Sequence, residues 1–126
     1  MVKNYKKFYQ MDIWIEAYNL GKEVFDLTSN FPREEKYGLV DQLNRSSNSV
    51  TANIAEAHGR FYYADKVRVL YTVRGEIQET QSHLIVGKSR RYLEKEKCVI
   101  LVGKYEKLKM KLNGYIADFS KKKSQK

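Results

Sequence analysis

The 126-residue sequence contains one cysteine, one proline and two histidines, and these shortages exclude several classes of protein. A single thiol, Cys98, can form no disulfide within the chain and no zinc site that needs several cysteines. We expect it to be a small residue of the hydrophobic core. No stretch approaches the ~20 apolar residues of a membrane-spanning helix, and the start MVKNYKKFYQ lacks the apolar segment of a signal peptide. We therefore expect a cytoplasmic protein.

Sequence motifs of catalysis are also missing. The chain has no glycine-rich phosphate-binding loop, no HExxH zinc motif and no Gly-x-Ser-x-Gly nucleophile motif. Glu79 and His83 lie one helical turn apart, but a metal ion would need further ligands that this spacing does not supply. We predict no catalytic residue, no metal and no cofactor. An enzyme with a composite active site at a subunit interface is the alternative.

The sequence is rich in the apolar spacing of amphipathic helices. Four segments repeat apolar residues three and four apart, at about 11–30, 32–58, 63–92 and 94–120. Short turns separate them, and there is almost no strand pattern. This order predicts an all-α protein, an antiparallel up-down-up-down four-helix bundle.

The ends of the chain differ from its middle. Both ends are rich in lysine, and the helical spacing is confined to the residues between them. We predict a basic N-terminal arm at 1–9, the four-helix bundle at 10–120, and a basic disordered tail at 121–126. The only proline, Pro32, suits the first turn of the second helix, and Gly59 is suited to end that helix.

The first helical segment has a second apolar stripe, about 100° around the helix from its core-facing residues. This stripe includes Trp14, Tyr18 and Phe25. One interpretation is a single wide surface that faces the core, and the other is an additional interface. Because a contiguous exposed patch of such residues is unfavourable, we predict that Trp14, Tyr18 and Phe25 form an oligomer interface.

The second helical segment carries a polar stripe beside its core-facing residues. Arg45, Ser49, Asn53 and Glu56 make up this stripe, and the third segment offers Arg74 and Glu79 as possible partners for Glu56 and Arg45. The stripe is either a solvated helix face or a satisfied polar seam, buried between helices or subunits, that fixes their register. We predict a structural polar seam, with the members Arg45, Ser49, Asn53, Glu56 and Glu79.

The net charge of +9 is unevenly distributed. Lysines before residue 8 and after residue 120 account for seven of the nine charges. Within the predicted bundle, residues 8–58 carry four basic and eight acidic groups, whereas residues 59–120 carry thirteen basic and seven acidic groups. The folded part therefore has an acidic first half and a basic second half.

A basic protein of this kind can attract the phosphate backbone of RNA or DNA. The sequence has no helix-turn-helix, zinc finger or basic zipper, so it predicts no sequence-specific reader. The predicted nucleic-acid-binding residues are Lys97, Lys104, Lys107, Lys111, Lys121, Lys122 and Lys123. We predict a non-catalytic oligomeric scaffold that associates with nucleic acid. The alternative is a structural protein–protein interaction module whose lysines only confer solubility.

Several short motifs resemble those of a known family. They are Tyr37-Gly38-Leu39, Gln42-Leu43, Arg45, Asn53-Ile54-Ala55-Glu56 and Gly59-Arg60, with Phe31-Pro32, Glu35, Gly75 and Glu79 outside this stretch. Together they resemble the bacterial four-helix-bundle family first noticed as proteins encoded in intervening sequences of 23S ribosomal RNA genes. The resemblance spans roughly residues 8–119 and implies a four-helix bundle that assembles into a ring-shaped homopentamer. Three residues are larger than the family's usual ones: Ala57, Val73 and Glu76.

Overall fold

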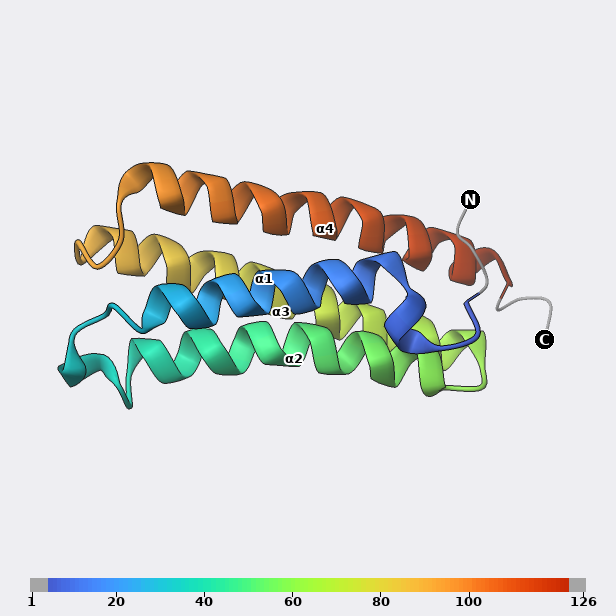
Figure 1. Ribbon diagram of the computed structural model, residues 1–126. Coiled ribbons are helices and arrows are strands. Elements are labelled where there is room, and N and C mark those ends of the chain that lie inside the picture. Colours follow the sequence, from blue (N-terminus) through green and yellow to red (C-terminus); the bar gives the residue numbers. More distant parts are fainter. Residues whose placement is uncertain (1–4, 123–126) are drawn as a thin grey trace.

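The computed structural model describes residues 5–122 and shows a bundle of four antiparallel helices (Figure 1). The helices are α1 (Asp12–Thr28), α2 (Leu39–Gly59), α3 (Tyr63–Ser89) and α4 (Lys95–Lys122). Two short 3₁₀ turns, η1 (Phe8–Gln10) and η2 (Arg33–Glu35), precede α1 and α2. Each helix packs against the next in sequence, and α4 returns to α1. Residues 5–122 include no strand, and the prediction of an all-α four-helix bundle is confirmed.

The apolar residues that repeat along each helix fill a single core. Ile13, Leu43, Ile77 and Leu108, one from each helix, are completely buried. Each such side chain contributes about 1.5 to 3 kcal/mol by leaving water. Cys98 also lies in this core, as predicted, and burial raises the pKa of its thiol.

The second helix begins later than the sequence predicted. Residues after Pro32 form η2, and α2 begins only at Leu39. The carboxylate of Glu35 explains this start, because its Oε1 accepts the backbone N–H of Leu39 at 3.1 Å and so satisfies a donor that a helix start leaves unpaired. A Cβ atom at position 38 would lie 2.8 Å from Glu35 Oε1, so a residue larger than Gly38 would displace this carboxylate.

Glu35 also joins this turn to the connection between α3 and α4. Its Oε2 accepts hydrogen bonds from Arg90 at 3.0 Å and from the hydroxyl of Tyr92 at 2.8 Å. The bond from the Leu39 amide, together with these two, lowers the pKa of Glu35. One carboxylate thus caps α2 and fixes one end of the bundle.

The C-terminus of α3 is closed by a residue in the left-handed conformation. Arg91 has a φ of 67°. The Arg91 amide donates to Lys88 O and the Tyr92 amide donates to Gly87 O, both at 2.9 Å, which is the paired pattern of a Schellman motif. Glycine is the usual residue at this position, so an arginine there does not predict this turn.

Both ends of the described chain lie at the same end of the bundle (Figure 1). Tyr5 and Phe8 of the predicted N-terminal arm pack against the core. At the other end, α4 continues through Lys121 and Lys122, the first two residues of the predicted tail. Residues 1–4 and 123–126, including Lys123, lie outside the described residues. Within residues 5–122, no helix combines the length and apolarity needed to cross a bilayer.

Candidate functional site

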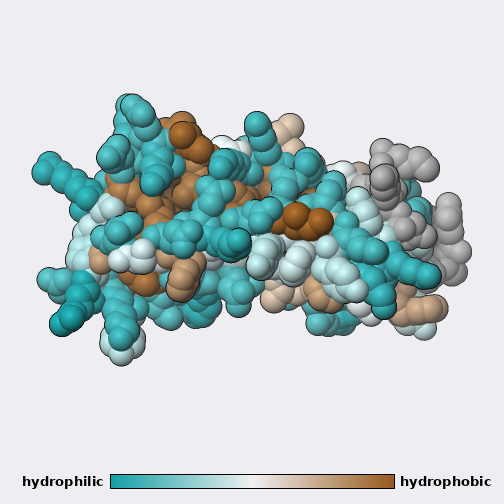
Figure 2. Space-filling model, viewed as in Figure 1, coloured by the Kyte–Doolittle hydropathy of each residue, from teal (hydrophilic) through white to brown (hydrophobic). Residues whose placement is uncertain are grey.

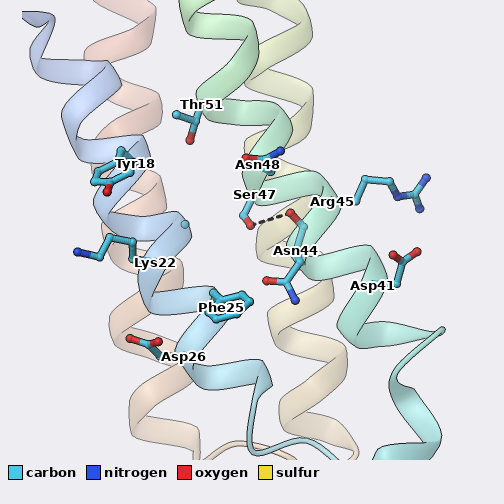
Figure 3. A pocket seen from close by; sticks show the side chains of 11 residues that line it. Tyr18, Lys22, Phe25, Asp26, Asp41, Asn44, Arg45, Ser47, Asn48 and Thr51 are labelled. Atoms are coloured by element: carbon cyan, nitrogen blue, oxygen red, sulfur yellow. Dashed lines mark hydrogen bonds between the residues drawn. The ribbon is translucent and has the colours of Figure 1, made fainter. Parts of the chain in front are cut away.

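A groove of about 590 Å³ lies between α1 and α2 (Figure 3). Phe25 projects from α1 toward α2, with Asp26 and Asp41 at the same end of the groove. Gly21 contributes no side chain to the groove, and a Cβ atom there would meet nothing within 4 Å. The lining residues are Tyr18, Gly21, Lys22, Phe25 and Asp26 of α1 and Asp41, Asn44, Arg45, Ser47, Asn48 and Thr51 of α2.

The three predicted interface residues differ in exposure. Phe25 is 65% exposed and Tyr18 is 47% exposed, so both present aromatic surface to solvent. Trp14 is partly buried, because it stacks on Tyr18 with ring centroids 5.3 Å apart and meets the edge of Phe8 at 5.4 Å. Trp14 therefore supports Tyr18 from within the chain, while Tyr18 and Phe25 form the exposed part of the groove.

The five residues of the predicted polar seam lie in different environments. Asn53 reaches α3, where its Nδ2 lies 3.1 Å from each carboxylate oxygen of Glu76. Ser49 is partly buried on α2, and Arg45 is exposed beside the groove. Glu56 pairs at 2.8 Å with Arg60, the residue that follows α2, and Glu79 pairs with His83 at 3.4 Å within α3.

The charge pairs suggested by the sequence are replaced by others in the structure. Arg74 donates to Asn113 of α4 at 3.0 Å instead of meeting Glu56. Gln81 also reaches α4, where its amide donates to the carbonyl of Val102 and to Glu106, both at 3.1 Å. These two polar residues interrupt the apolar spacing of α3 because they hydrogen-bond to α4. A seam that joins Arg45, Glu56 and Glu79 between subunits remains a prediction.

The sequence did not identify the residues that complete the contact between α2 and α3. Below the Asn53–Glu76 pair, Thr80 Oγ1 lies 2.8 Å from Ser46 Oγ and 2.9 Å from the backbone oxygen of Glu76, and both hydroxyls are buried. Burial raises the pKa of Glu76, and the hydrogen bond from Asn53 opposes that rise. The one available signal was Glu76 itself, a carboxylate where the family usually has a smaller residue.

The predicted basic stripe on α4 is partly neutralised by α1. Lys104 Nζ lies 3.1 Å from both oxygens of Glu23, and Lys111 pairs with Glu16, which raises the pKa of Lys111. Lys97 is exposed in a groove that also contains Glu23, Asp26, Glu94 and Glu96. Lys107 and Lys121 are exposed, and Lys122 pairs with Asp118 at 3.1 Å.

The net charges of the helices follow the same division. α1 carries one basic and four acidic side chains, and α4 carries eight basic and three acidic ones. These helices also meet through the hydroxyl of Tyr115, which donates to Asp12 at 2.7 Å. The burial of Tyr115, together with that bond, raises the pKa of its hydroxyl. The boundary between α1 and α4 is therefore lined by complementary charges.

A smaller cavity of about 210 Å³ lies at the end of the bundle near Tyr5, His58 and Lys66. Lys66 donates to the backbone oxygens of Ala57 and His58, so it caps the C-terminus of α2. His58 Nε2 lies 3.0 Å from the backbone oxygen of Tyr5 and holds the arm in place. Residues 5–122 contain no group of three histidine, cysteine or carboxylate side chains arranged to hold a metal ion.

The fold and these surfaces define a four-helix-bundle protein with an exposed aromatic groove and a basic fourth helix. The chain belongs to the 23S rRNA-intervening sequence protein family, whose pattern matches residues 9–114. This confirms the resemblance seen in the sequence motifs.

A similar fold occurs in the crystal structure of a protein of unknown function from the S23 ribosomal protein family of Bacteroides thetaiotaomicron VPI-5482. The two structures align with a TM-score of 0.74 and 20% sequence identity, over 82% of this chain and 97% of the other. At this identity the similarity concerns the fold alone. No curated protein matches the chain.

Proposed function

We propose that this protein is a non-catalytic scaffold that self-associates and holds RNA or DNA through the basic surface of its fourth helix. The main observation in favour of self-association is the exposed pair of aromatic residues, Tyr18 and Phe25, beside an open groove. Burial of one such side chain in a subunit contact stabilises the contact by about 1.5 to 3 kcal/mol. The homopentamer implied by the family resemblance is the assembly that we propose.

Nucleic-acid binding is supported by the charge of α4. Its eight basic and three acidic side chains give a net charge of +5, more than any other helix carries. Such a surface attracts the phosphate backbone without reading the base sequence. An oligomer would bring several copies of α4 onto one polymer, which strengthens binding beyond that of one copy.

A protein–protein interaction module without nucleic-acid binding is the second candidate. The observation that favours it is the pairing of Lys104 with Glu23 and of Lys111 with Glu16. Each pair already supplies the lysine with a carboxylate, so fewer lysines are available for phosphate groups. The groove would then serve only to bind protein.

Two measurements test the proposal, and the first is the mass in solution. Light scattering should give a mass several times the 14.9 kDa of one chain. A monomer at every concentration would contradict self-association, and with it the gain in affinity expected from several copies.

The second measurement is the salt dependence of binding to single-stranded and duplex RNA and DNA, followed by fluorescence anisotropy. Lys107→Gln should reduce the slope of log K against log salt by about 0.9, because one phosphate contact is lost. Lys104→Gln changes the charge equally but removes a lysine that is paired with Glu23, so it should reduce the slope less.

Removal of residues 121–126 separates the tail from the folded surface. If the tail alone binds, the truncated protein should lose affinity for every ligand alike, and Lys107→Gln in the full chain should change nothing. We expect the truncated protein to keep part of its binding through α4. If the intact protein binds none of these ligands at low salt, nucleic-acid binding is refuted and the protein–protein module is the better account.

A further inference from the structure

A second exposed apolar surface lies on α3 and α4. Val99 and Met110 of α4 are 61% and 66% exposed, and Ile85 of α3 is 50% exposed. Val99, Gly103, Met110 and Gly114 are spaced by four, seven and four residues, so they share one face of α4. Cys98 Sγ lies 3.6 Å from Leu84 O, so the residues that follow them, Val99 and Ile85, lie at the same level along the bundle. We call Ile85, Val99 and Met110 the α3–α4 ridge.

Glu106 lies on the same face of α4 between Val99 and Met110, and it pairs with Lys109 at 3.0 Å. Gly103 and Gly114 contribute no side chain to this face, and a Cβ atom added at either would meet nothing within 4 Å. In the space-filling view, hydrophobic atoms gather over the first part of α4 (Figure 2). The α3–α4 ridge therefore consists of exposed aliphatic side chains around one ion-paired carboxylate, on a helix with a net positive charge.

The ridge and the α1–α2 groove lie on opposite sides of the molecule. α1 packs against α2 and α4, and α3 packs against the same two helices, so the pair α1–α2 is opposite the pair α3–α4 (Figure 1). One surface is a groove with exposed aromatic residues, and the other presents exposed aliphatic side chains on both sides of Glu106. Two different apolar surfaces on opposite sides allow each copy to contact two neighbours.

The charges of the two sides are opposite in sign. α1 and α2 together carry six acidic and two basic side chains, a net charge of −4. α3 and α4 together carry twelve basic and six acidic side chains, a net charge of +6. Contacts between two like sides bring like charges together, whereas contacts between unlike sides bring opposite charges together.

We infer that the α1–α2 groove of one copy receives the α3–α4 ridge of the next copy. This inference rests on the self-association proposed above and identifies the two surfaces that meet. Phe25 and Tyr18 of one copy then cover Val99 and Met110 of its neighbour, while Asp26 and Asp41 face a positively charged side. Because the two surfaces differ, the contact is heterologous, and repeated copies form a ring if the rotation closes or a filament if it does not.

A mixing experiment with two variants tests the inference. Phe25→Glu places a charge in the groove and leaves the ridge intact, whereas Met110→Glu places a charge on the ridge and leaves the groove intact. Each variant alone should have the mass of one chain, 14.9 kDa. An equimolar mixture should contain a dimer of about twice that mass, because an intact ridge meets an intact groove. Light scattering coupled to size-exclusion chromatography measures both.

Controls separate this inference from the proposed function. Phe61→Glu changes a residue that is 76% exposed in the turn between α2 and α3, and it should keep the mass of the unmodified protein. Phe25 and Met110 are both exposed, so Phe25→Glu and Met110→Glu should keep the helical circular dichroism of the unmodified protein. If Met110→Glu does not fold, Val99→Glu introduces the same charge on the ridge.

Three outcomes have different meanings. If the unmodified protein is a monomer, the proposed self-association fails. If the unmodified protein is an oligomer but Met110→Glu and Val99→Glu keep its mass, the ridge is not the partner of the groove and the inference is overturned. The inference is also overturned if both variants are monomeric and their mixture contains no dimer.

Discussion

Asn53→Ala is the most direct test of the contact between α2 and α3. In the structure, the Asn53 amide lies 3.1 Å from both carboxylate oxygens of Glu76, which is partly buried. A hydrogen bond to a charged group contributes about 1.5 to 3 kcal/mol, and partial exposure of Glu76 places this one near the lower limit. We expect Asn53→Ala to lower the free energy of unfolding by about 1.5 to 2 kcal/mol near neutral pH.

The loss should depend on pH in a defined direction. Burial raises the pKa of Glu76, and the bond from Asn53 lowers it, so removal of Asn53 leaves the effect of burial unopposed. The pKa of Glu76 in the folded variant should therefore rise further above the ordinary value of 4.5. When the pKa of a group is higher in the folded than in the unfolded state, protonation of that group favours the folded state at low pH. This contribution to stability is lost as the pH rises through the folded pKa. The variant should thus be most impaired near neutral pH and least impaired below that ordinary value.

Urea unfolding followed by circular dichroism measures both effects, provided that the protein concentration is the same in all samples. Glu56→Ala is a suitable control, because Glu56 forms only an exposed pair with Arg60, and we expect it to cost less than about 1 kcal/mol. An equal loss of unfolding free energy for Asn53→Ala near neutral pH and below the ordinary pKa of a glutamate would refute the role given to Glu76. So would a double-mutant cycle in which the effects of Asn53→Ala and Glu76→Ala simply add.

Three further predictions concern two glycines of α3 and one buried tyrosine of α4. Gly87→Ala should lower the free energy of unfolding by about 1 to 2 kcal/mol, because a Cβ atom there would lie 2.9 Å from a methyl carbon of buried Leu93 and 3.3 Å from the ring of Phe31. Gly75→Ala, which meets nothing within 4 Å, should instead raise it by up to about 1 kcal/mol in the same urea titration. Tyr105→Phe should raise the melting temperature, because the fully buried Tyr105 hydroxyl has no hydrogen-bond partner among residues 5–122 and its removal gains about 1 kcal/mol. A lower melting temperature would indicate that this hydroxyl is satisfied by water.

Helical spacing was sufficient to predict the four helices and their order, because core-facing residues repeat regularly in each. It was insufficient for the start of α2. There, Glu35 caps the helix from a preceding turn, and its position depends on Arg90 and Tyr92, which are 55 and 57 residues away in sequence. Such a cap depends on tertiary contacts, and the local sequence around Pro32 favours an earlier start.

The candidate site shows a similar limit. Spacing predicted a polar stripe that includes Asn53 and named Glu79 as its member on the third helix, whereas in the structure the residue of α3 that meets Asn53 is Glu76. Periodicity gives the face of a helix, whereas the choice of partner depends on how far one helix is shifted along the other. For the same reason, helical spacing could not predict that Lys104 and Lys111 pair with Glu23 and Glu16, because these pairs depend on how α1 lies against α4.

The boundary between α1 and α4 joins parts of the chain that are far apart in sequence. Lys104 and Glu23 are 81 residues apart, Lys111 and Glu16 are 95 apart, and Tyr115 and Asp12 are 103 apart. To close a loop of that length in an unfolded chain costs about 4 kcal/mol in entropy, before any constant is added. An exposed ion pair returns less than about 1 kcal/mol, so the two lysine pairs together cannot offset the closure. The buried side chains of α1 must supply that free energy, and the ion pairs then determine how α1 is aligned against α4.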